Sequence, residues 1–129
     1  MPSVFTQIVN GEIPCHKILE DDQHLAFLDI NPIRPGHTLV ITKRQIDYIF
    51  DLEDNLLSGL MIFSKKVGTA IKKATYCQRV GVVVAGYEVP HTHVHLIPTN
   101  SMSDFNFALS QQADQGELAA MVTKIQEYL

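Results

Sequence analysis

Cysteine is scarce in this chain of 129 residues, which contains only Cys15 and Cys77. Without a Cys-x-x-Cys pair, these residues predict neither a disulfide framework nor a thiolate zinc cage. No uncharged apolar run reaches about 18 residues, and the chain does not begin with a cationic stretch followed by an apolar segment, so the sequence predicts neither a membrane span nor a secretory signal. We therefore expect a cytoplasmic protein.

Glycine, proline and positive charge are also in short supply. The composition of 7 Gly, 6 Pro, 46% apolar and 19% charged residues excludes disordered and fibrous proteins and predicts one packed core. Ten Lys and Arg against 14 Asp and Glu give a formal net charge of -4, which is the wrong sign for gripping long nucleic acid through its phosphates. A small anionic ligand is compatible with this charge if local donors offset it.

The order of the expected elements predicts the fold. No repeat, low-complexity tract or flexible linker divides the chain, so we expect one domain over residues 1–129. Residues 17–20 and 24–29 are expected to form two strands around a hairpin turn. A loop rich in Pro and Gly at 31–36 then leads into a third strand at 37–42.

The second half of the chain adds two helices and two strands. Apolar residues at helical spacing over 51–74 predict one long amphipathic helix. The nearly all-apolar run 79–85 predicts a central strand buried on both faces, and strict alternation over 91–98 predicts another strand, ended by its proline. A capping box at 114–117 predicts a C-terminal helix. The expected fold class is α+β, an antiparallel sheet of about five strands with one long central helix and a C-terminal helix.

The candidate catalytic residues are His91, His93 and His95, which are three of the six histidines of the chain. Residues at i, i+2 and i+4 of a strand project from one face, roughly 6.6–6.8 Å apart. Three imidazoles are therefore expected to share one concavity, while the residues between them face the opposite side and pack. Chance is a weak explanation for this density.

Three interpretations compete for this cluster. Structural histidines would each need separate hydrogen-bond partners. A zinc site would need a further ligand, because strand spacing makes it hard for three rings to converge on one ion. We favour covalent catalysis, in which a neutral imidazole, with an unperturbed pKa of about 6.5, attacks phosphorus while its neighbours orient it and donate to the phosphoryl oxygens. Backbone N–H groups over 86–89 are expected to cradle the oxyanion.

Residues 91–98, with Gly86, Glu88 and Val89 before them, resemble the signature of the histidine triad (HIT) family of nucleotide hydrolases and transferases, in particular its Hint branch. The N-terminal half resembles the family in order as well, through residues 5–8, 10–14, 20–22, 26–32 and 35–41. The resemblance covers residues 4–98, and the C-terminal extension over 99–129 adds little to it.

This resemblance implies a homodimer of α+β protomers, each of which binds a purine nucleoside monophosphate moiety and cleaves a P–N or P–O–P bond at its α-phosphorus. It implies His93 as the nucleophile and His91 and His95 as neighbours that orient it and contact phosphate. His37 is then a fourth imidazole near the phosphate. No cofactor and no metal are expected.

The resemblance also implies which residues bind the nucleotide. Asp29 would accept the ribose hydroxyls, and the loop that carries Glu88 and Val89 would border the nucleotide. An apolar wall would surround the base, formed by Phe5, Ile8, Phe27 and Ile30. Two alternatives stay open, because Asp29 is also typical of a turn before proline and the four apolar residues are also typical of plain core.

Departures from the family pattern carry expectations of their own. Zinc-bearing bacterial members carry a Cys-x-x-Cys pair where Ser3 and Thr6 stand here, and a histidine where Gln45 stands. Hydroxyls and an amide are poor ligands for Zn²⁺, so we expect no structural zinc. The loop before Tyr87 is shorter than in many relatives, and Glu88 is unfavourable beside an anion unless its carboxylate turns away.

We therefore expect a hydrolase that acts on nucleoside phosphoramidates or dinucleoside polyphosphates through a nucleotidyl-His93 intermediate. Two alternatives stay open: a nucleotide-binding regulatory or interaction module with little catalysis, and a metal-dependent hydrolase. The sequence names neither the leaving group nor the base.

Overall fold

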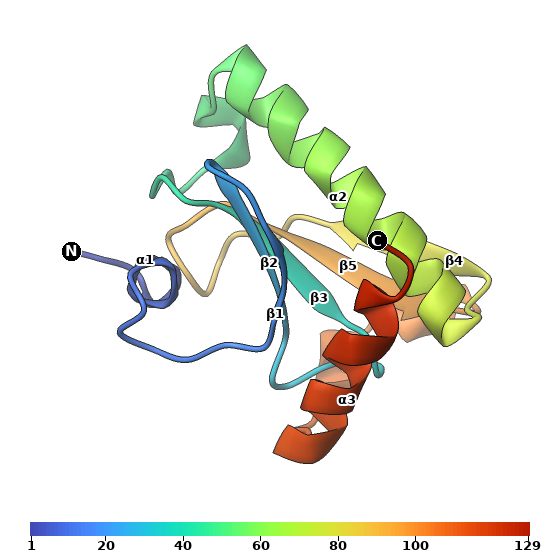
Figure 1. The fold of residues 1–129 in the computed structure, drawn as a ribbon. Coiled ribbons are helices and arrows are strands. Elements are labelled where there is room, and N and C mark those ends of the chain that lie inside the picture. The colour runs from blue at the N-terminus through green and yellow to red at the C-terminus, as the bar shows by residue number, and fades with distance from the viewer.

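The structure, a computed structural model, describes residues 1–129 as a five-stranded antiparallel sheet with helices on both faces (Figure 1). The strands are β1 (Lys17–Glu20), β2 (His24–Leu28), β3 (Thr38–Thr42), β4 (Arg79–Val83) and β5 (His93–Thr99), in the spatial order β1-β2-β3-β5-β4. The α-helices are α1 (Val4–Val9), α2 (Asp54–Thr75) and α3 (Gln115–Gln126), and short 3-10 turns lie at Ile49–Asp51, Met102–Asp104 and Phe107–Leu109. The expected α+β class is confirmed.

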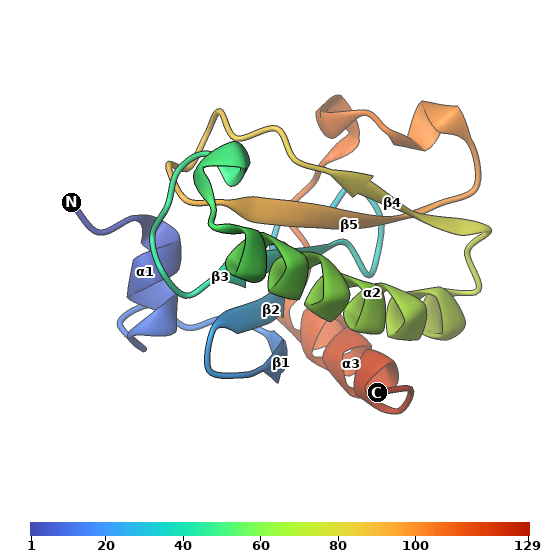
Figure 2. The same ribbon diagram turned by 90° about the horizontal axis from the view of Figure 1, so that it is seen from above.

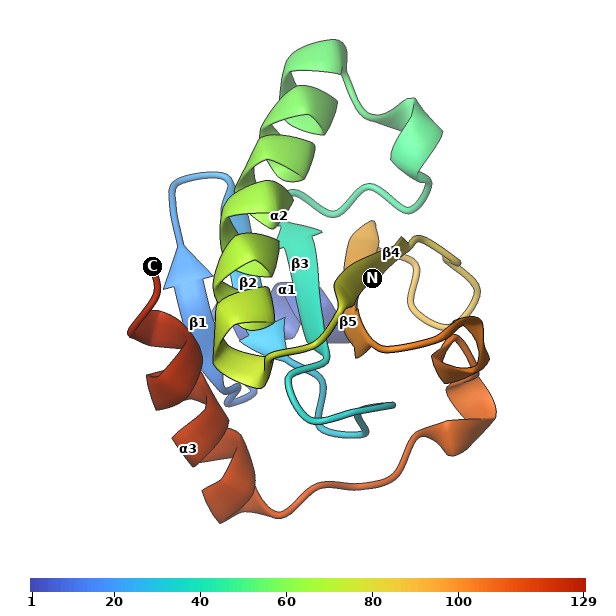
Figure 3. The same cartoon turned by 90° about the vertical axis from the view of Figure 1, so that its right-hand side faces the viewer.

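The three inner strands give the sheet two apolar faces. Every residue of β2, β3 and β5 is buried, and successive side chains point to opposite sides. Val40, Val94 and Leu96 enter the main core with α2 and α3. Phe27 and Leu39 enter a smaller cluster with Phe5 of α1. Figure 3 shows α2 in front of the strands and α1 behind them.

Helix α2 covers one face because its apolar residues recur on one side. Leu60, Val67 and Ile71 have no exposed surface, and the helix ends before Tyr76, which is left-handed at φ 56° and donates its N–H to Lys72. The expected helix over 51–74 is confirmed, although it begins at Asp54, and Asp51, its predicted first residue, belongs to a 3-10 turn instead. No helix in the structure has both the length and the apolar content needed to cross a membrane.

Two features predicted from local polar residues, the β1–β2 turn and the start of α3, are also present. At the β1–β2 hairpin, Asp21 accepts the backbone N–H groups of Gln23 and His24 at 2.9 and 2.7 Å. Asp114 caps α3 by accepting the N–H of Glu117 at 3.1 Å. Both turns follow from short acidic side chains that satisfy nearby N–H groups, a preference that depends little on the rest of the fold.

Two strand predictions need correction. Residues 79–85 were expected to form a central strand, but β4 lies at the edge of the sheet and Val82 is 53% exposed. An apolar run cannot distinguish a strand covered on both sides from one whose apolar face is left at the surface. The strand predicted over 91–98 begins at His93 and continues past Pro98. Proline is tolerated there because pairing with β3 stops at Leu96.

Two segments near the ends were not anticipated. Helix α1 is capped by Ser3, which accepts the N–H of Thr6 at 3.0 Å, and the short apolar start had suggested no helix. The chain after β5 (orange in Figure 2) runs on the side of β5 away from α2 before it returns to α3. An ion pair of 3.1 Å between Arg34 and Asp104, and a 3.0 Å bond from the N–H of Ala113 to Ile30, hold it along the loop before β3.

Candidate active site

Two adjoining cavities open on the α1 side of the sheet. Strand register places the residues there: β5 pairs with β3 so that His93 lies opposite Ile41 and His95 opposite Leu39, both of which belong to the cluster beneath α1. One cavity is mainly apolar, with a volume of about 280 Å³, and the other is more polar, with a volume of about 350 Å³. Four residues line both cavities: Asp29, Glu88, His93 and His95.

The ring of His93 presents a free nitrogen where the cavities meet. Its Nδ1 donates to the carbonyl oxygen of His91 at 2.6 Å, which places the proton on Nδ1 and a lone pair on Nε2. The rings of Phe5 and His95 stand edge-on at centroid distances of 5.0 and 5.1 Å. No protein group hydrogen-bonds Nε2, so this atom is available to a ligand.

His95 offers the complementary group, an N–H donor, through a chain of hydrogen bonds that begins at the backbone. The N–H of Ile33 donates to Nδ1 of His37 at 3.0 Å, so the proton of His37 lies on Nε2. That Nε2 donates to Nδ1 of His95 at 3.0 Å, which leaves His95 with its own proton on Nε2. His93 therefore presents a lone pair at Nε2 to the cavities, and His95 presents an N–H at its own Nε2.

The expectation that all three triad rings share one concavity is wrong for His91. This residue precedes β5, has no exposed surface and lines neither cavity. Its Nε2 donates to the carbonyl oxygen of Thr42 at 2.6 Å, and its Nδ1 lies 2.7 Å from the hydroxyl of Ser3. His91 reaches the site through its backbone carbonyl, because the strand geometry on which the prediction depended begins only at His93.

Comparison with known protein families identifies the domain. The model of the HIT domain family matches residues 10–102, which is more than half of the chain. The chain belongs to the HIT family.

Other HIT proteins match the chain over most of its length. The adenosine 5'-monophosphoramidase hnt1 of Schizosaccharomyces pombe is 39% identical over 100 residues, 76% of this chain and 74% of the relative. A Hit-like protein involved in cell-cycle regulation from Bartonella henselae has a TM-score of 0.87, 29% identity and coverage of 98% and 96% of the two chains. A zinc-bound histidine triad family protein from Mycobacterium smegmatis has a TM-score of 0.79, 25% identity and coverage of 96% and 95%.

Burial keeps the inner imidazoles of this HIT site neutral. Desolvation, followed by the neighbouring His95, lowers the pKa of His37 to about 3. Desolvation, followed by His93, lowers the pKa of His95 to about 4. Burial also lowers the pKa of His91, while its bond to Thr42 opposes the shift. Neutral rings are what the hydrogen-bond chain requires, since a protonated His37 would have no lone pair for the N–H of Ile33.

These shifts predict that acid destabilises the fold. In the unfolded chain His37 and His95 titrate near the ordinary value of 6.5, so between about pH 6.5 and 4 the unfolded state binds more protons than the folded state. We expect the free energy of unfolding from urea titrations to be highest above pH 6.5 and to fall steadily toward pH 4. Replacing both histidines with asparagine should flatten that slope, and an equally flat wild-type curve would contradict the prediction.

Asp29 combines the two interpretations that the sequence left open. Its Oδ1 accepts the N–H of Asn31 at 2.9 Å, as in a turn, while the side chain also lines both cavities. Burial raises its pKa, the bond from Asn31 opposes that rise, and the charge of Glu88 adds to it. One oxygen is thus held by the turn, which orients the other toward the cavities, 3.7 Å from Nε2 of His37.

The expected apolar wall comes together as a unit. All four wall residues line the apolar cavity, with Glu88 and Val89 on its border. Phe5 and Phe27 also belong to the core cluster beneath α1, at a centroid distance of 5.6 Å. Ile30 is 49% exposed and belongs to no core cluster, so the alternative of plain core does not apply to it. The nucleotide-binding roles of these residues stay predictions.

Sequence reasoning missed the residues that complete the polar cavity. Phe107 stands edge-on to His95 at a centroid distance of 5.0 Å, and Ser110 lines the cavity beside it. Both lie in the C-terminal extension that had been set aside, and no motif marks them. The remaining lining residues are Asn31, Ala85, Gly86 and Tyr87. Gly86 has a φ of 80° with open space around it, so the short loop bends there without steric cost.

The residues at the zinc position of other HIT proteins do not fit zinc here. Ser3, Thr6 and Gln45 do meet beside Nδ1 of His91, but hydroxyl and amide oxygens lack the charge and softness of the thiolates and imidazoles that bind Zn²⁺. The hydroxyl of Ser3 already occupies the Nδ1 lone pair. A second group, Asp29, His37 and His95, has ligand atoms within 4.8 Å of one another, yet two of those nitrogens already share a hydrogen bond.

Proposed function

We propose that this HIT protein is a nucleotide hydrolase that cleaves at the α-phosphorus of nucleoside phosphoramidates or dinucleoside polyphosphates through a covalent nucleotidyl-His93 intermediate. One observation carries the proposal: Nδ1 of His93 is held by the His91 carbonyl at 2.6 Å, so the Nε2 lone pair faces the junction of the two cavities. The monophosphoramidase activity named for the Schizosaccharomyces pombe relative supports it.

In such a reaction the cavities would bind different parts of the substrate. The apolar cavity suits a base, since an apolar slot binds bases without strong choice among purines, and the carboxylate of Asp29 suits two ribose hydroxyls. The α-phosphorus then lies at the junction, where Nε2 of His93 attacks it and the bond to the leaving group breaks. The N–H at Nε2 of His95 donates to a phosphoryl oxygen as negative charge develops. Water then cleaves the bond between phosphorus and Nε2 of His93, which releases the nucleoside monophosphate and restores the free ring.

The test follows products and protein mass together. Purified protein is incubated with adenosine 5'-phosphoramidate or a diadenosine polyphosphate, with and without excess chelator, and sampled for adenosine monophosphate and for intact mass. We expect monophosphate to accumulate in both buffers and an adduct of one nucleoside monophosphate to appear on quenched protein. Turnover that stops with chelator would favour a metal-dependent hydrolase instead.

A binding module with little catalysis is the second candidate, and the charge of the site favours it. Asp29 and Glu88 both border the junction, and no Lys or Arg lines either cavity. No cationic side chain is therefore placed to stabilise the negative charge that develops on the phosphoryl oxygens during attack, which disfavours turnover more than nucleotide binding. Equal slow turnover by the wild type and by His93→Ala, together with measurable binding of adenosine monophosphate, would support this candidate and overturn the hydrolase.

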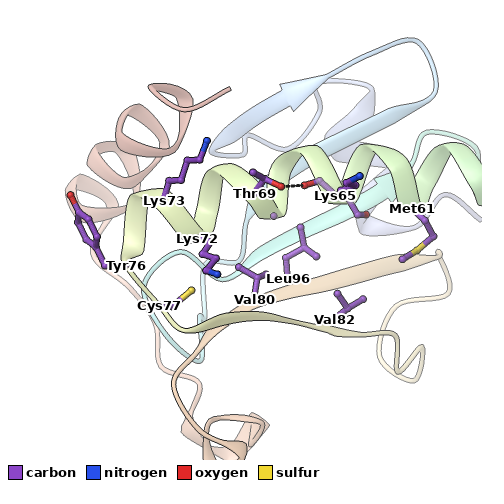
Figure 4. A pocket seen from close by; sticks show the side chains of 12 residues that line it. Met61, Lys65, Thr69, Lys72, Lys73, Tyr76, Cys77, Val80, Val82 and Leu96 are labelled. Atoms are coloured by element: carbon purple, nitrogen blue, oxygen red, sulfur yellow. Dashed lines mark hydrogen bonds between the residues drawn. The ribbon is translucent and has the colours of Figure 1, made fainter.

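We also propose that two copies of the chain pair through α2 and β4. Figure 4 shows a groove between these elements, of about 690 Å³, with Met61, Val80 and Val82 among its lining residues. The free edge of β4 offers unpaired backbone groups to a second strand. We expect sedimentation to give twice the chain mass, and Val82→Glu to give the monomer. Ile62→Glu, on α2 outside the groove, is the matched control, and a dimer that survives Val82→Glu would contradict the proposal.

A further inference from the structure

Four polar residues from three distant segments meet behind the nucleophile. Ser3 caps α1, Gln45 follows β3, and His91 precedes β5. Oε1 of Gln45 accepts the backbone N–H of Ser3 and the hydroxyl of Thr6, each at 2.7 Å. The hydroxyl of Ser3 lies 2.7 Å from Nδ1 of His91. We call these four residues the polar clamp.

The shortest contacts assign the protons of the polar clamp, because the competing contacts from the Ser3 hydroxyl to the Thr6 hydroxyl and from the Thr6 hydroxyl to Nδ1 of His91 are longer, at 3.3 and 3.4 Å. The carbonyl of Thr42 only accepts, so the 2.6 Å bond places the proton of His91 on Nε2 and a lone pair on Nδ1. That lone pair needs a donor, and the hydroxyl of Ser3 supplies it. Ser3 has its oxygen lone pairs left for the N–H of Thr6 at 3.0 Å. Nε2 of His24, whose ring packs against Phe63 of α2, is the only buried side-chain polar atom without a partner.

The polar clamp connects directly to the reacting ring. The carbonyl of His91 is the acceptor that keeps the proton of His93 on Nδ1. Phe5 lies between Ser3 and Thr6, is the one buried residue of α1, and stands 5.0 Å from His93. A helix of six residues is too short to be stable by itself, so its position depends on Phe5 and on the clamp.

We propose that Ser3 is a positioning residue, whose hydroxyl donates to Nδ1 of His91 within a metal-free clamp and so holds the His91 carbonyl that fixes the tautomer of His93. By the family resemblance, the clamp takes the positions of the metal ligands of zinc-bearing members, and ordered hydrogen bonds hold it together without a metal. The kinetic part of this inference rests on the proposed function, whereas the hydrogen-bond part does not.

Three substitutions at Ser3 separate donation from helix capping. Ser3→Ala removes both the cap and the donor. Ser3→Asp keeps a good cap, but an ionised carboxylate has no proton to donate, so His91 takes a second proton and becomes an imidazolium that opposes the positive charge developing on His93 during attack. Ser3→Thr keeps both the cap and the donor. Asp114→Ala, which removes the cap of α3 away from the cavities, is the matched control for loss of a cap.

The experiment measures kcat and KM with adenosine 5'-phosphoramidate, thermal unfolding, and ¹⁵N spectra of the histidine rings. We expect kcat to fall about 10- to 100-fold in Ser3→Ala and Ser3→Asp, with KM changed less than kcat, and Ser3→Thr to restore most of the rate. Asp114→Ala should lower the melting temperature and leave kcat near wild type. The ring signals of His91 and His93 should change tautomer or charge in Ser3→Ala and Ser3→Asp only.

Ser3→Asp decides between the two roles. Wild-type kcat and unchanged ring signals in Ser3→Asp would show that Ser3 only caps α1, and would overturn the inference. If Ser3→Ala does not fold, the comparison of Ser3→Thr with Ser3→Asp gives the same decision, since both keep the cap. Absence of turnover in the wild type would contradict the proposed function, while the ring signals would still show whether Ser3 holds the tautomers of His91 and His93.

Discussion

Replacing His93 with alanine is expected to lower turnover of adenosine 5'-phosphoramidate by about 10⁴-fold or more, because removal of a covalent nucleophile eliminates the two-step pathway. Binding of adenosine monophosphate should survive within a few-fold, since His93 is only one of the residues that line the apolar cavity and the others, with Asp29, remain. Single-turnover kinetics and calorimetric titration measure the two quantities separately. The nucleotide adduct seen by intact mass should disappear as well.

His16→Ala is the matched control for this substitution. His16 lies outside both cavities and bonds Gln115 at 2.7 Å, so its loss should leave kcat close to the wild-type value. A His93→Ala variant that keeps more than about a tenth of the wild-type rate would exclude the covalent route, because a protein without its nucleophile cannot form the covalent intermediate.

Replacing His95 with alanine is the second large effect. This change removes the Nε2–H donor from the junction of the cavities, and loss of one preorganised donor to a developing oxyanion costs about 10²- to 10³-fold in kcat. KM should change much less, because the donor acts mainly as charge develops. His95→Gln, whose amide N–H reaches a similar position, should recover part of the rate. The measurement is kcat and KM for both variants at pH 7.

The hydrogen-bond chain behind His95 makes this prediction specific. His37 holds the proton of His95 on the outer nitrogen through the 3.0 Å bond between the rings. His37→Ala leaves Nδ1 of His95 without a donor, so the ring can adopt the other tautomer and the rate should fall, though less than in His95→Ala. A kcat in His95→Ala within about threefold of wild type would show that another group stabilises the oxyanion, and would remove His95 from the mechanism.

Much of the fold followed from local patterns. The β-branched run at 37–42 and the alternation along 91–98 predicted two of the inner strands, because strand propensity and the side-chain period of a strand are local properties. The hairpin at Asp21 and the cap at Asp114 followed from short acidic side chains beside free N–H groups. Prediction failed for β4, since its place at the edge depends on which strands pair. It also failed for α1, whose six residues are held by contacts with distant segments.

The candidate site was also predicted only in part. Its histidines were visible because three of them fall within five residues, and Asp29 and the apolar wall were named through the family resemblance. The sequence also pointed to the segment at His91 but placed its ring in the wrong environment, because the strand begins two residues later. No motif pointed to Phe107 or Ser110, since they reach the polar cavity only through the return of the chain along the 30–34 loop.

By itself, the sequence predicted which kinds of side chain would carry the chemistry and that alternate histidines project from one side of a strand, which holds for His93 and His95 because spacing along a strand is a local property. Tertiary structure alone decided which nitrogen of each ring holds the proton. That choice belongs to partners brought from far along the chain, such as Ile33 for His37 and Ser3 for His91. From the sequence, either ring nitrogen of a neutral histidine can carry the proton. In the folded protein, a neighbour that accepts or donates a hydrogen bond at one nitrogen decides whether the other nitrogen presents a lone pair or an N–H.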